Sequence, residues 1–501
     1  MSRTTKKDPK ELERCVDSYG RVHALAGEIS RGGQGAVFRT GTPNVVVKFE
    51  LRGDENGPID SPKYLVSANE NAKYMELRFL PIPKSAHVTM PLATLQKYGG
   101  YVMQMMSDML SFQQSFDEFG RKGEDRMKIE TPFTRRADAK TDGFFSDYIS
   151  TGGERRRLEA YMKSAALLAQ LHSRGLVYCD YSQNNVFISK NMDHCNVWLI
   201  DADNLAYESR TVSGALFTPG LAAPEVFLFW NELGKNVPLD DCTGRGNSFA
   251  SDAYTFAMCL FKQLAGCSPF KGAAFDEAAQ KFDSADEGDI LVQTGQFAYI
   301  ADPDDSSNRG YPLPLDAVLS PELKELFRQT FCQEGRDNCL SRPGMCEWAE
   351  ELARAHDWSL HCNVCGMDYI SEEDRKCPWC DETMPALLTA ESTYAEHTRG
   401  APPLWRFRRE LKNGAVSLPL RLAHGYDANE LDKKLLTAFF ENGEMILRVD
   451  VTDPNLEILY SDDGQNFAAY RTIKAPPKCF YLRCKNVARH SDVLVKCEVS
   501  S

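Results

Sequence analysis

The sequence predicts an α+β protein of several domains, because helical periodicity, short strands bounded by turns and a four-cysteine cluster follow one another along 501 residues. A chain of this length corresponds to about three domains of ordinary size. Hydrophobic residues make up 43% of the chain and aromatic residues 10%, enough to fill packed cores. The net charge of −13 argues against a protein that binds nucleic acid by neutralising phosphates.

The N-terminal segment and the cysteines bear on the cellular compartment. Residues 1–14 are polar and charged, so we expect no secretory signal, and no apolar run approaches the ~18 residues that span a bilayer. Sixteen cysteines would indicate disulfides in a short secreted protein but fit that interpretation poorly in so long a chain. We therefore expect a cytoplasmic protein that contacts neither membrane nor nucleic acid.

A glycine-rich turn and a strand with a lysine characterise the first domain. Residues 29–38 predict a strand, a tight glycine turn and a second strand. Glycines let a backbone approach phosphates closely, although a plain hairpin would also need them. The next strand, at 45–49, carries Lys48 within an apolar run, where a lysine is often only an edge-strand charge. Its position directly after the glycine hairpin favours a functional role.

Residues 68–80 form a plausible helix that carries two acids. Glu70 shares a face with apolar residues four and seven positions later, so we choose it as the ion-pair partner of Lys48. Glu76 is the alternative, and either acid could be a solvated surface charge. The methionine-rich strand at 101–106 is usual core material that could also form the adenine side of a nucleotide cleft.

An acid, an amide and a second acid follow the helix predicted at 154–173. Asp180 precedes Asn185 by five residues, and Asp201 ends the next apolar run. Asp and Asn often occupy turns for backbone reasons, so this spacing alone is only suggestive. In phosphoryl transfer, one carboxylate accepts a proton from the attacking hydroxyl, while the amide and the second carboxylate hold magnesium against ATP.

Taken in order, these features resemble the eukaryotic-type serine/threonine protein kinases of bacterial kind. Four later segments match further kinase motifs, and the resemblance covers about residues 20–355. The segments are Thr218 to Glu225 (the Ala-Pro-Glu segment), Ser251 to Phe256 (the start of the central large-lobe helix), Gly266 to Phe270 (its end) and Arg342-Pro343. In kinases the arginine of the last motif pairs with the Ala-Pro-Glu glutamate, here Glu225.

The resemblance implies a bilobal protein-kinase fold, with an N-terminal extension at 1–19, a small lobe at 20–106 and a large lobe at 107–357. Lys48, held by Glu70, would bind the α- and β-phosphates of ATP. Asp180 would orient and deprotonate the acceptor hydroxyl, and Asn185 and Asp201 would ligate Mg2+. The residues implied to cover the nucleotide or line the adenine pocket are Ser30, Gly32, Gly35, Val37, Met103, Gln104 and Met105.

Several positions depart from the kinase pattern. Tyr178 and Cys179 replace the usual His-Arg, so we predict no strict need for activation-loop phosphorylation. Ser182 stands in place of a lysine near the γ-phosphate, and Ala202-Asp203 in place of Phe-Gly. These changes motivate a rival interpretation, a pseudokinase scaffold that binds ATP without transfer. A small-molecule phosphotransferase of the aminoglycoside-kinase type is a weaker rival, because such enzymes lack the Ala-Pro-Glu segment.

Two Cys-x2-Cys pairs separated by eleven residues follow the large lobe: Cys362, Cys365, Cys377 and Cys380. Four thiolates at this spacing predict a structural zinc ribbon at 358–384. Iron in a rubredoxin-like site is a lesser alternative, and paired disulfides are less favoured still. Since four cysteines fill the coordination shell, we expect no catalytic role for the metal.

The remaining chain predicts a linker at 385–403 and a β-rich domain at 404–501, a small β-sandwich for partner or substrate recognition. Its expected strands lie at 416–422, 445–451, 456–460, 468–473, 479–484 and 493–499. This combination resembles kinases that accompany a von Willebrand A-type protein and a metal-dependent phosphatase in tellurite-resistance-related systems. The resemblance implies that those partner proteins are the substrates and that a cognate phosphatase exists.

Overall fold

The computed structural model describes residues 12–32, 35–51, 65–116, 147–208, 216–218, 220–236, 244–282, 298–309, 315–370, 376–396, 402–411, 414–441, 444–474 and 476–500. The chain forms two compact units. The first comprises Met1–Ser115, Gln170–Thr218 and Val226–Asp252, and the second Phe116–Ala169, Pro219–Glu225 and Ala253–Ser501. Within the described ranges, no helix is both long enough and apolar enough to cross a membrane.

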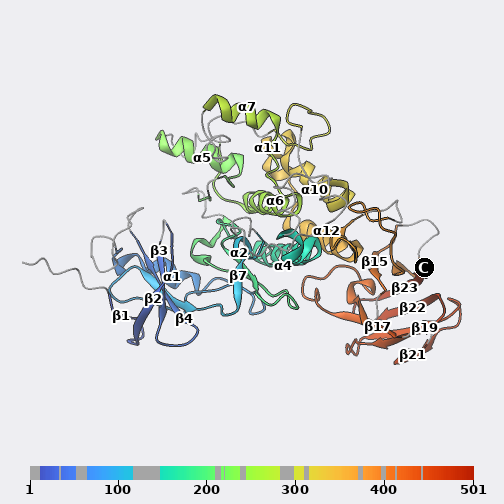
Figure 1. Ribbon diagram of the computed structural model, residues 1–501. Coiled ribbons are helices and arrows are strands. Elements are labelled where there is room, and N and C mark those ends of the chain that lie inside the picture. Colours follow the sequence, from blue (N-terminus) through green and yellow to red (C-terminus); the bar gives the residue numbers. More distant parts are fainter. Residues whose placement is uncertain are drawn as a thin grey trace, which may run out of the picture. The chain divides into compact units, whose positions relative to one another are not determined.

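A six-stranded antiparallel sheet, drawn in blue in Figure 1, forms the core of the first unit in the order β1-β2-β3-β4-β6-β5. Its strands are β1 (Arg14–Val16), β2 (Val22–Gly32), β3 (Gly35–Thr40), β4 (Val45–Glu50), β5 (Ala93–Thr94) and β6 (Gly100–Gln104). Alternate residues of the strands are buried on one face, as the twofold period of a strand requires. The buried face includes Ala36, Val47, Phe49 and Val102.

The helix predicted at 68–80 is shorter in the structure and is divided in two. A 3-10 helix, η1 (Ala68–Glu70), precedes α1 (Ala72–Leu77). Between them, the Asn71 side chain donates to the backbone oxygens of Leu95 and Tyr98 and accepts from the Gly100 N–H. These three bonds tie the residue between the two helices to the sheet, which explains why the helix does not run on unbroken.

Two small sheets in the first unit flank the loop that contains Asp180. One has the order β10-β9-β7, the other pairs β8 with β11, and a 3-10 helix, η4, follows β10. Their bounds are β7 (Met109–Ser111), β8 (Leu176–Val177), β9 (Val186–Ser189), β10 (Val197–Leu199), η4 (Ala202–Asn204) and β11 (Ala206–Tyr207). β9 and β10 form an antiparallel hairpin, with Val186 opposite Leu199. The hairpin brings the end of β10 back beside the loop.

Most of the described helices lie between residues 112 and 358. They are α2 (Phe112–Phe116), α4 (Gly153–His172), α5 (Pro224–Gly234), α6 (Phe249–Ala265), α7 (Ala273–Phe282), α9 (Leu315–Val318), α10 (Pro321–Phe331), α11 (Gln333–Asp337), η7 (Cys339–Ser341) and α12 (Met345–Trp358). In the second unit, Phe256 of α6 packs against Tyr161 of α4 and Trp348 of α12, with ring centroids 5.6 and 5.9 Å apart. Edge-on aromatic contacts of this kind give the helical core a defined geometry.

Beyond α12 the second unit contains a two-stranded knuckle and two larger antiparallel sheets, drawn in orange and red in Figure 1. The larger sheets have the orders β15-β14-β23-β22-β19-β20 and β16-β17-β18-β21. The elements are β12 (Leu360–His361), β13 (Asp368–Tyr369), β14 (Leu387–Tyr394), β15 (Trp405–Glu410), β16 (Gly414–Pro419), η8 (Leu420–Leu422), β17 (Lys434–Glu441), β18 (Glu444–Val449), β19 (Leu456–Ser461), β20 (Ala468–Ala469), β21 (Thr472–Lys474), β22 (Cys479–Asn486) and β23 (Ser491–Ser500).

The linker expected at 385–403 is wrong for its first half. β14 occupies Leu387–Tyr394 and pairs with both β15 and β23, so it is an interior strand of the six-stranded sheet. The proline, threonine, serine and glycine content of the segment and its lack of sustained periodicity suggested a linker. The expected strand list also omitted β15 and β17, the second of which pairs with β16 and β18.

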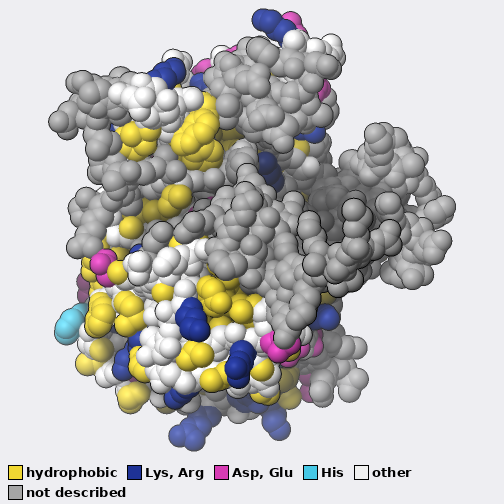
Figure 2. Space-filling view, turned by 90° about the vertical axis from the view of Figure 1, so that its left-hand side faces the viewer, with side chains coloured by type: hydrophobic (Ala, Val, Ile, Leu, Met, Phe, Trp, Pro, Cys, Tyr) yellow, Lys and Arg dark blue, Asp and Glu magenta, His cyan; other side chains and the backbone are white. Residues whose placement is uncertain are grey.

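Surface charge on the described part of the chain is mixed. On the face shown in Figure 2, Lys and Arg side chains are interspersed with apolar and uncharged ones.

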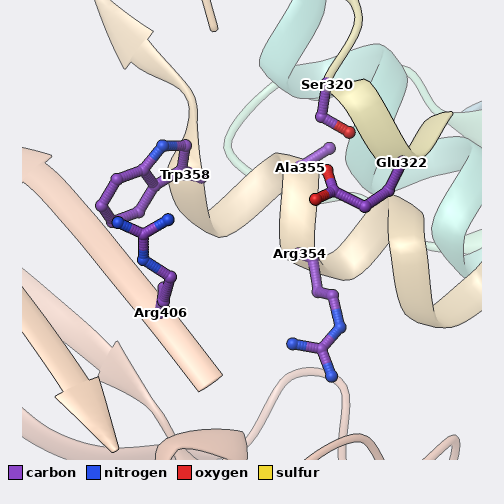
Figure 3. A pocket seen from close by; sticks show the side chains of 6 residues that line it. All are labelled: Ser320, Glu322, Arg354, Ala355, Trp358 and Arg406. Carbon is purple, nitrogen blue, oxygen red and sulfur yellow. The ribbon is translucent and has the colours of Figure 1, made fainter. Parts of the chain in front are cut away.

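The last helix, α12, is joined to β15 by arginine–tryptophan stacking within the second unit. Figure 3 shows the Arg406 guanidinium lying against the Trp358 ring, with 4.0 Å between its central carbon and the ring centroid. Arg354 stacks on Trp405 in the same manner, at 4.4 Å. A small cavity of about 100 Å3 lies between these side chains and the start of α10 at Ser320 and Glu322. The two arginines also pair with Glu350 and Glu391, so this cavity belongs to the joint itself.

Candidate active site

The hairpin of β2 and β3 contains the four residues expected to cover a nucleotide. Ser30 lies opposite Val37 and Gly32 opposite Gly35, while residues 33 and 34 at the tip lie outside the described ranges. A Cβ atom on Gly35 would come within 2.6 Å of the Phe49 carbonyl oxygen. Glycine is therefore required for β3 to pass this close to β4, which carries Lys48.

Lys48 lies on β4 opposite Val37, and its side chain is only 8% exposed. Its Nζ donates to the carboxylate of Asp201 and, at 2.8 Å, to Oδ2 of Asp203. Burial by itself would lower the pKa of Lys48, but the two carboxylates outweigh it and hold the pKa above its usual value. The lysine is thus a buried, fully charged cation that faces two acids.

The acids that Lys48 contacts are not the ones chosen from the sequence. Glu70 ends η1, and its side chain lies outside the described part of the structure. Glu76 lies on α1. Among the described residues, the ion pairs of Lys48 are those with Asp201 and Asp203. The pairing with Glu70 therefore stays a prediction, and Asp203 is a partner that motif spacing did not identify.

The loop between β8 and β9 presents Asp180 with both carboxylate oxygens bonded. Thr218 Oγ1 donates to Oδ1 at 2.9 Å, and Asn185 Nδ2 donates to Oδ2 at 3.2 Å. Burial raises the pKa of Asp180, and these two donors counteract that rise. The carboxylate is thereby fixed in one orientation with lone pairs to spare, as a group that accepts a proton from a substrate must be.

Backbone bonds to Asp252 hold the start of this loop in place. The N–H groups of Tyr178 and Cys179 donate to the Asp252 carboxylate at 2.7 and 3.0 Å, and His172 lies 3.0 Å from the same group. Cys179 adopts a left-handed φ of 72°, which is uncommon for a residue other than glycine. The aspartate singled out in the motif at 251–256 therefore shapes the turn that leads into Asp180.

Asp201 is brought beside the loop by the β9–β10 hairpin. The Ile200 N–H donates to the Asn185 carbonyl oxygen at 2.9 Å, and Asp201 has a left-handed φ of 57° as it leads into η4. Asp203 follows two residues later and is buried. Burial raises its pKa to about 6, and the charge of Asp201 adds to the rise. The structure thus brings Lys48, Asp180, Asn185 and Asp201 together within one unit.

The residues expected at the adenine side lie on or just beyond the strand next to Lys48. Met103 and Gln104 of β6 lie opposite Val46 and Val45 of β4. The Met105 N–H donates to the Asn44 carbonyl oxygen at 2.9 Å. The Met105 sulfur also accepts from Arg39 Nη1 at 3.4 Å. Their role at the adenine side of a nucleotide cleft stays a prediction.

The donor set suits a hard cation such as Mg2+. Three carboxylates, those of Asp180, Asp201 and Asp203, lie in this region, and Lys48 contacts two of them. Asp203 Oδ1 is buried without a hydrogen-bond partner in the described structure. Carboxylate and amide oxygens are the ligands that Mg2+ prefers, and added positive charge would relieve the excess of acid. Asn185 and Asp201 are the residues that would hold the ion.

The four cysteines expected to bind zinc form one cluster in the second unit. Their sulfurs all lie within 4.8 Å of one another, with 3.6 Å between those of Cys362 and Cys380 and 3.7 Å between those of Cys365 and Cys377. Zn–S bonds of ~2.3 Å in a tetrahedron place sulfurs roughly 3.8 Å apart, so the thiols fit zinc. None of the four forms a disulfide, which argues against the paired-disulfide alternative.

Backbone turns and a buried carboxylate fix the cysteine cluster. The Gly366 N–H donates to the Cys362 carbonyl oxygen at 2.9 Å, and Gly366 has a φ of 74° that favours glycine. Asp368 accepts from the Arg155 N–H at 2.9 Å and lies 2.8 Å from His361 Nδ1. The cluster is therefore anchored to α4, and His361 is occupied by a carboxylate instead of a metal.

A further kinase-motif residue pair is confirmed in the second unit. Arg342 forms a two-bond ion pair with Glu225, with both N···O distances at 2.8 Å, and its guanidinium stacks on Tyr254 at 4.8 Å. The Arg342 side chain has no exposed surface. This is the partner that the resemblance assigned to the Ala-Pro-Glu glutamate.

Two residues of the site had only weak signals in the sequence. Thr218 belongs to the expected Ala-Pro-Glu segment, but its bond to Asp180 joins positions 38 residues apart. Asp203 was noted only as a departure from the kinase pattern. A charged residue in a position that is usually glycine could have indicated a new role.

Comparisons with known proteins agree with this geometry. The chain is 25% identical over 204 residues to the probable serine/threonine-protein kinase WNK8 of Oryza sativa subsp. japonica. The match covers 38% of this chain and 29% of the relative, so the chain spans less than a third of the curated relative's length. No family model matches the chain. A distant relative of this chain is thus a serine/threonine kinase.

Proposed function

We propose that this chain is an ATP- and Mg2+-dependent protein kinase that transfers the γ-phosphate to serine or threonine hydroxyls of partner proteins. The observation that carries the proposal is the convergence of Lys48, Asp180, Asn185 and Asp201 in one unit, with Asp180 oriented by two side-chain donors. The distant similarity to a serine/threonine kinase supports the same reaction class.

In the proposed reaction, the acceptor hydroxyl oxygen attacks the γ-phosphorus of ATP and its proton passes to a carboxylate oxygen of Asp180. The bond from the γ-phosphorus to the bridging oxygen breaks, and ADP leaves. Lys48 would neutralise charge on the α- and β-phosphates, and Asn185 and Asp201 would hold the metal. Mg2+ supplies electrostatic stabilisation of the phosphates when bound.

The rival scaffold function rests on one observation. Both carboxylates around Lys48 contact it directly, and Asp203 stands where kinases have a small flexible residue. A protein locked in this arrangement would bind nucleotide without transferring phosphate. The small-molecule phosphotransferase alternative is less supported, because such enzymes lack the ion pair between Arg342 and Glu225.

Labelled ATP separates these functions. Purified full-length protein is incubated with magnesium and labelled ATP, alone and with a generic protein substrate, beside Asp180→Asn and Lys48→Met. Removing the proton acceptor is expected to lower transfer by about 10²–10⁴-fold. Asp193→Asn, an exposed aspartate in the turn between β9 and β10, is the matched control and should retain full activity. Wild-type label no higher than that of Asp180→Asn would refute the kinase and favour the scaffold.

We also propose that the four-cysteine cluster binds one structural Zn2+ and that the β-rich C-terminal part recognises partners. A von Willebrand A-type protein as substrate and a cognate phosphatase are part of the proposal, on the basis of domain combination alone. Phosphorylation of such a protein, lost in Asp180→Asn, is the test. Metal analysis of the purified chain should give close to one equivalent of zinc, and less than about half an equivalent of zinc or iron would contradict the site.

A further inference from the structure

Asp203 is a buried acid in the candidate active site that the proposed reaction does not use. It is the middle residue of η4, and its Oδ2 accepts from Lys48 Nζ at 2.8 Å. Only 8% of its side chain is exposed, the same fraction as for Lys48. The two groups thus form an ion pair withdrawn from solvent. A pair of this kind keeps a more fixed geometry than a pair on the surface.

The two acids around Lys48 differ in exposure. The Asp201 side chain is 29% exposed, whereas that of Asp203 is 8% exposed. A metal–phosphate group that arrives from solvent therefore meets Asp201 first. Once Asp201 binds the cation, its charge is no longer available to Lys48, and Asp203 remains as the anion that faces the ammonium group.

The surroundings of Asp203 restrict its movement. α1 packs against η4, and Tyr74 of α1 lies against Tyr101 of β6 with ring centroids 4.7 Å apart. Both rings are buried. Burial raises the pKa of both hydroxyls, and the charge of Asp203 adds to the rise. Lys48 on β4 lies opposite Tyr101 on the paired strand β6. The Asp203 carboxylate therefore lies beside α1 and β6, and β6 is the strand paired with β4, which carries Lys48.

We propose that Asp203 is the positioning residue for Lys48, the carboxylate that keeps its ammonium group directed at the nucleotide phosphates while Asp201 binds the metal. In this chain Asp203 performs the task that motif spacing assigns to a glutamate of the helix at 68–80. The inference rests on the proposed kinase function for its consequence, but the contact itself can be tested without any phosphate transfer.

The first test measures the reactivity of Lys48 directly. Full-length protein, without nucleotide, is treated with trace acetic anhydride, and the acetylation rate at Lys48 is measured by peptide mass spectrometry. Asp203→Asn should raise that rate about tenfold, the size of one charge-assisted hydrogen bond. Asp203→Glu, which keeps the charge, should restore most of the protection, and Asp193→Asn should leave the rate unchanged.

The second test separates ground-state binding from catalysis. If Asp203 directs Lys48 at the phosphates, Asp203→Asn raises the KM for ATP and the Kd for ATP–Mg2+ about tenfold, with kcat changed less than about threefold. A purely structural defect would instead lower the amount of active protein and leave KM unaltered. Thermal unfolding of each variant confirms that the comparison is between folded proteins.

The outcomes are distinct. An unchanged Lys48 acetylation rate in Asp203→Asn, or a tenfold rise in Glu70→Gln instead, would overturn the inference and return the role to the helix glutamate. A wild-type protein that transfers no phosphate, yet shows the expected acetylation pattern, would refute the proposed kinase activity and leave the Asp203–Lys48 contact standing. If Asp203→Asn fails to fold, Asp203→Ser takes its place, and an unchanged acetylation rate at Lys48 in that variant overturns the inference.

Discussion

Replacing Asp357 with asparagine tests how α12 is attached to the β-rich C-terminal part. Asp357 is 1% exposed, and its carboxylate accepts two bonds from Arg421 at 2.6 Å each and one from Trp405 Nε1 at 2.8 Å. His356 Nδ1 lies 3.2 Å away. Asparagine preserves the shape but removes the charge and turns an N–H group toward the Arg421 guanidinium.

The expected loss follows from the burial of this pair. Removing one partner of a buried ion pair leaves an uncompensated charge and costs about 3 kcal/mol or more. For a unit of more than 150 residues, each kcal/mol shifts Tm by about 2–4 °C, so the variant should melt roughly 6–12 °C lower. The calorimetric transition that contains the second unit measures this shift.

A surface pair at the same joint provides the control. Arg406 contacts Glu391 at 3.0 Å, but both side chains are more than 40% exposed. Glu391→Gln should therefore cost about 1 kcal/mol or less. If Asp357→Asn melts within a few degrees of the wild type, as the control should, the reasoning about the buried network is wrong.

The pH dependence of Asp357→Asn has a defined sign. Burial alone would raise the pKa of Asp357, but Arg421 and His356 hold it well below its ordinary value near ~3.9. An acid with a lowered folded-state pKa stabilises the protein fully above its unfolded pKa and loses that stabilisation as pH falls. The difference in unfolding free energy between wild type and variant should thus be full at pH 7 and shrink below about pH 4. A difference that grows on acidification would contradict this assignment.

Three further variants test other contacts. Thr218→Val should lower kcat by about tenfold, because Asp180 loses one of its orienting donors, whereas Thr218→Ser should retain activity. Glu225→Gln should destabilise the second unit by about 3 kcal/mol in calorimetry, since it strands the Arg342 guanidinium, which has no exposed surface. Cys377→Ser should release the metal and lower Tm, whereas Cys346→Ser, outside the cluster, should do neither.

Each of these variants has a contradicting result. Normal kcat in Thr218→Val would show that Asn185 alone orients Asp180. A Glu225→Gln protein with unchanged Tm would mean that water reaches Arg342. Full zinc content in Cys377→Ser, measured by metal analysis, would place the ion elsewhere or show that three thiolates suffice.

Local patterns determined much of the fold. The helix predicted at 154–173 appears as α4 (Gly153–His172), and α10 and α12 show the same kind of local pattern. Their apolar residues recur at helical spacing, and α10 begins with a serine cap followed by proline. The cysteine pairs were equally readable, because each Cys-x2-Cys knuckle is a local turn.

The errors occurred where distant residues decide the structure. β14 has little local signal, and it is a strand because β23, about a hundred residues later, supplies one of its neighbours. The helix predicted at 68–80 is divided into η1 and α1 at Asn71, which bonds to the sheet at Leu95, Tyr98 and Gly100. Propensity cannot anticipate either event, since tertiary hydrogen bonds override it.

The sequence by itself determined which chemical groups are present: a lysine after a glycine hairpin, an acid and an amide five residues apart, a later acid and four cysteines. Their order was enough to indicate the family resembled and the reaction class. Only the tertiary structure decided which acid faces Lys48. Asp201 and Asp203 lie more than 150 residues from the lysine along the chain, and the packing of separate elements brings them to it. Spacing along a chain specifies local geometry, whereas contact between buried charges depends on how separate elements pack.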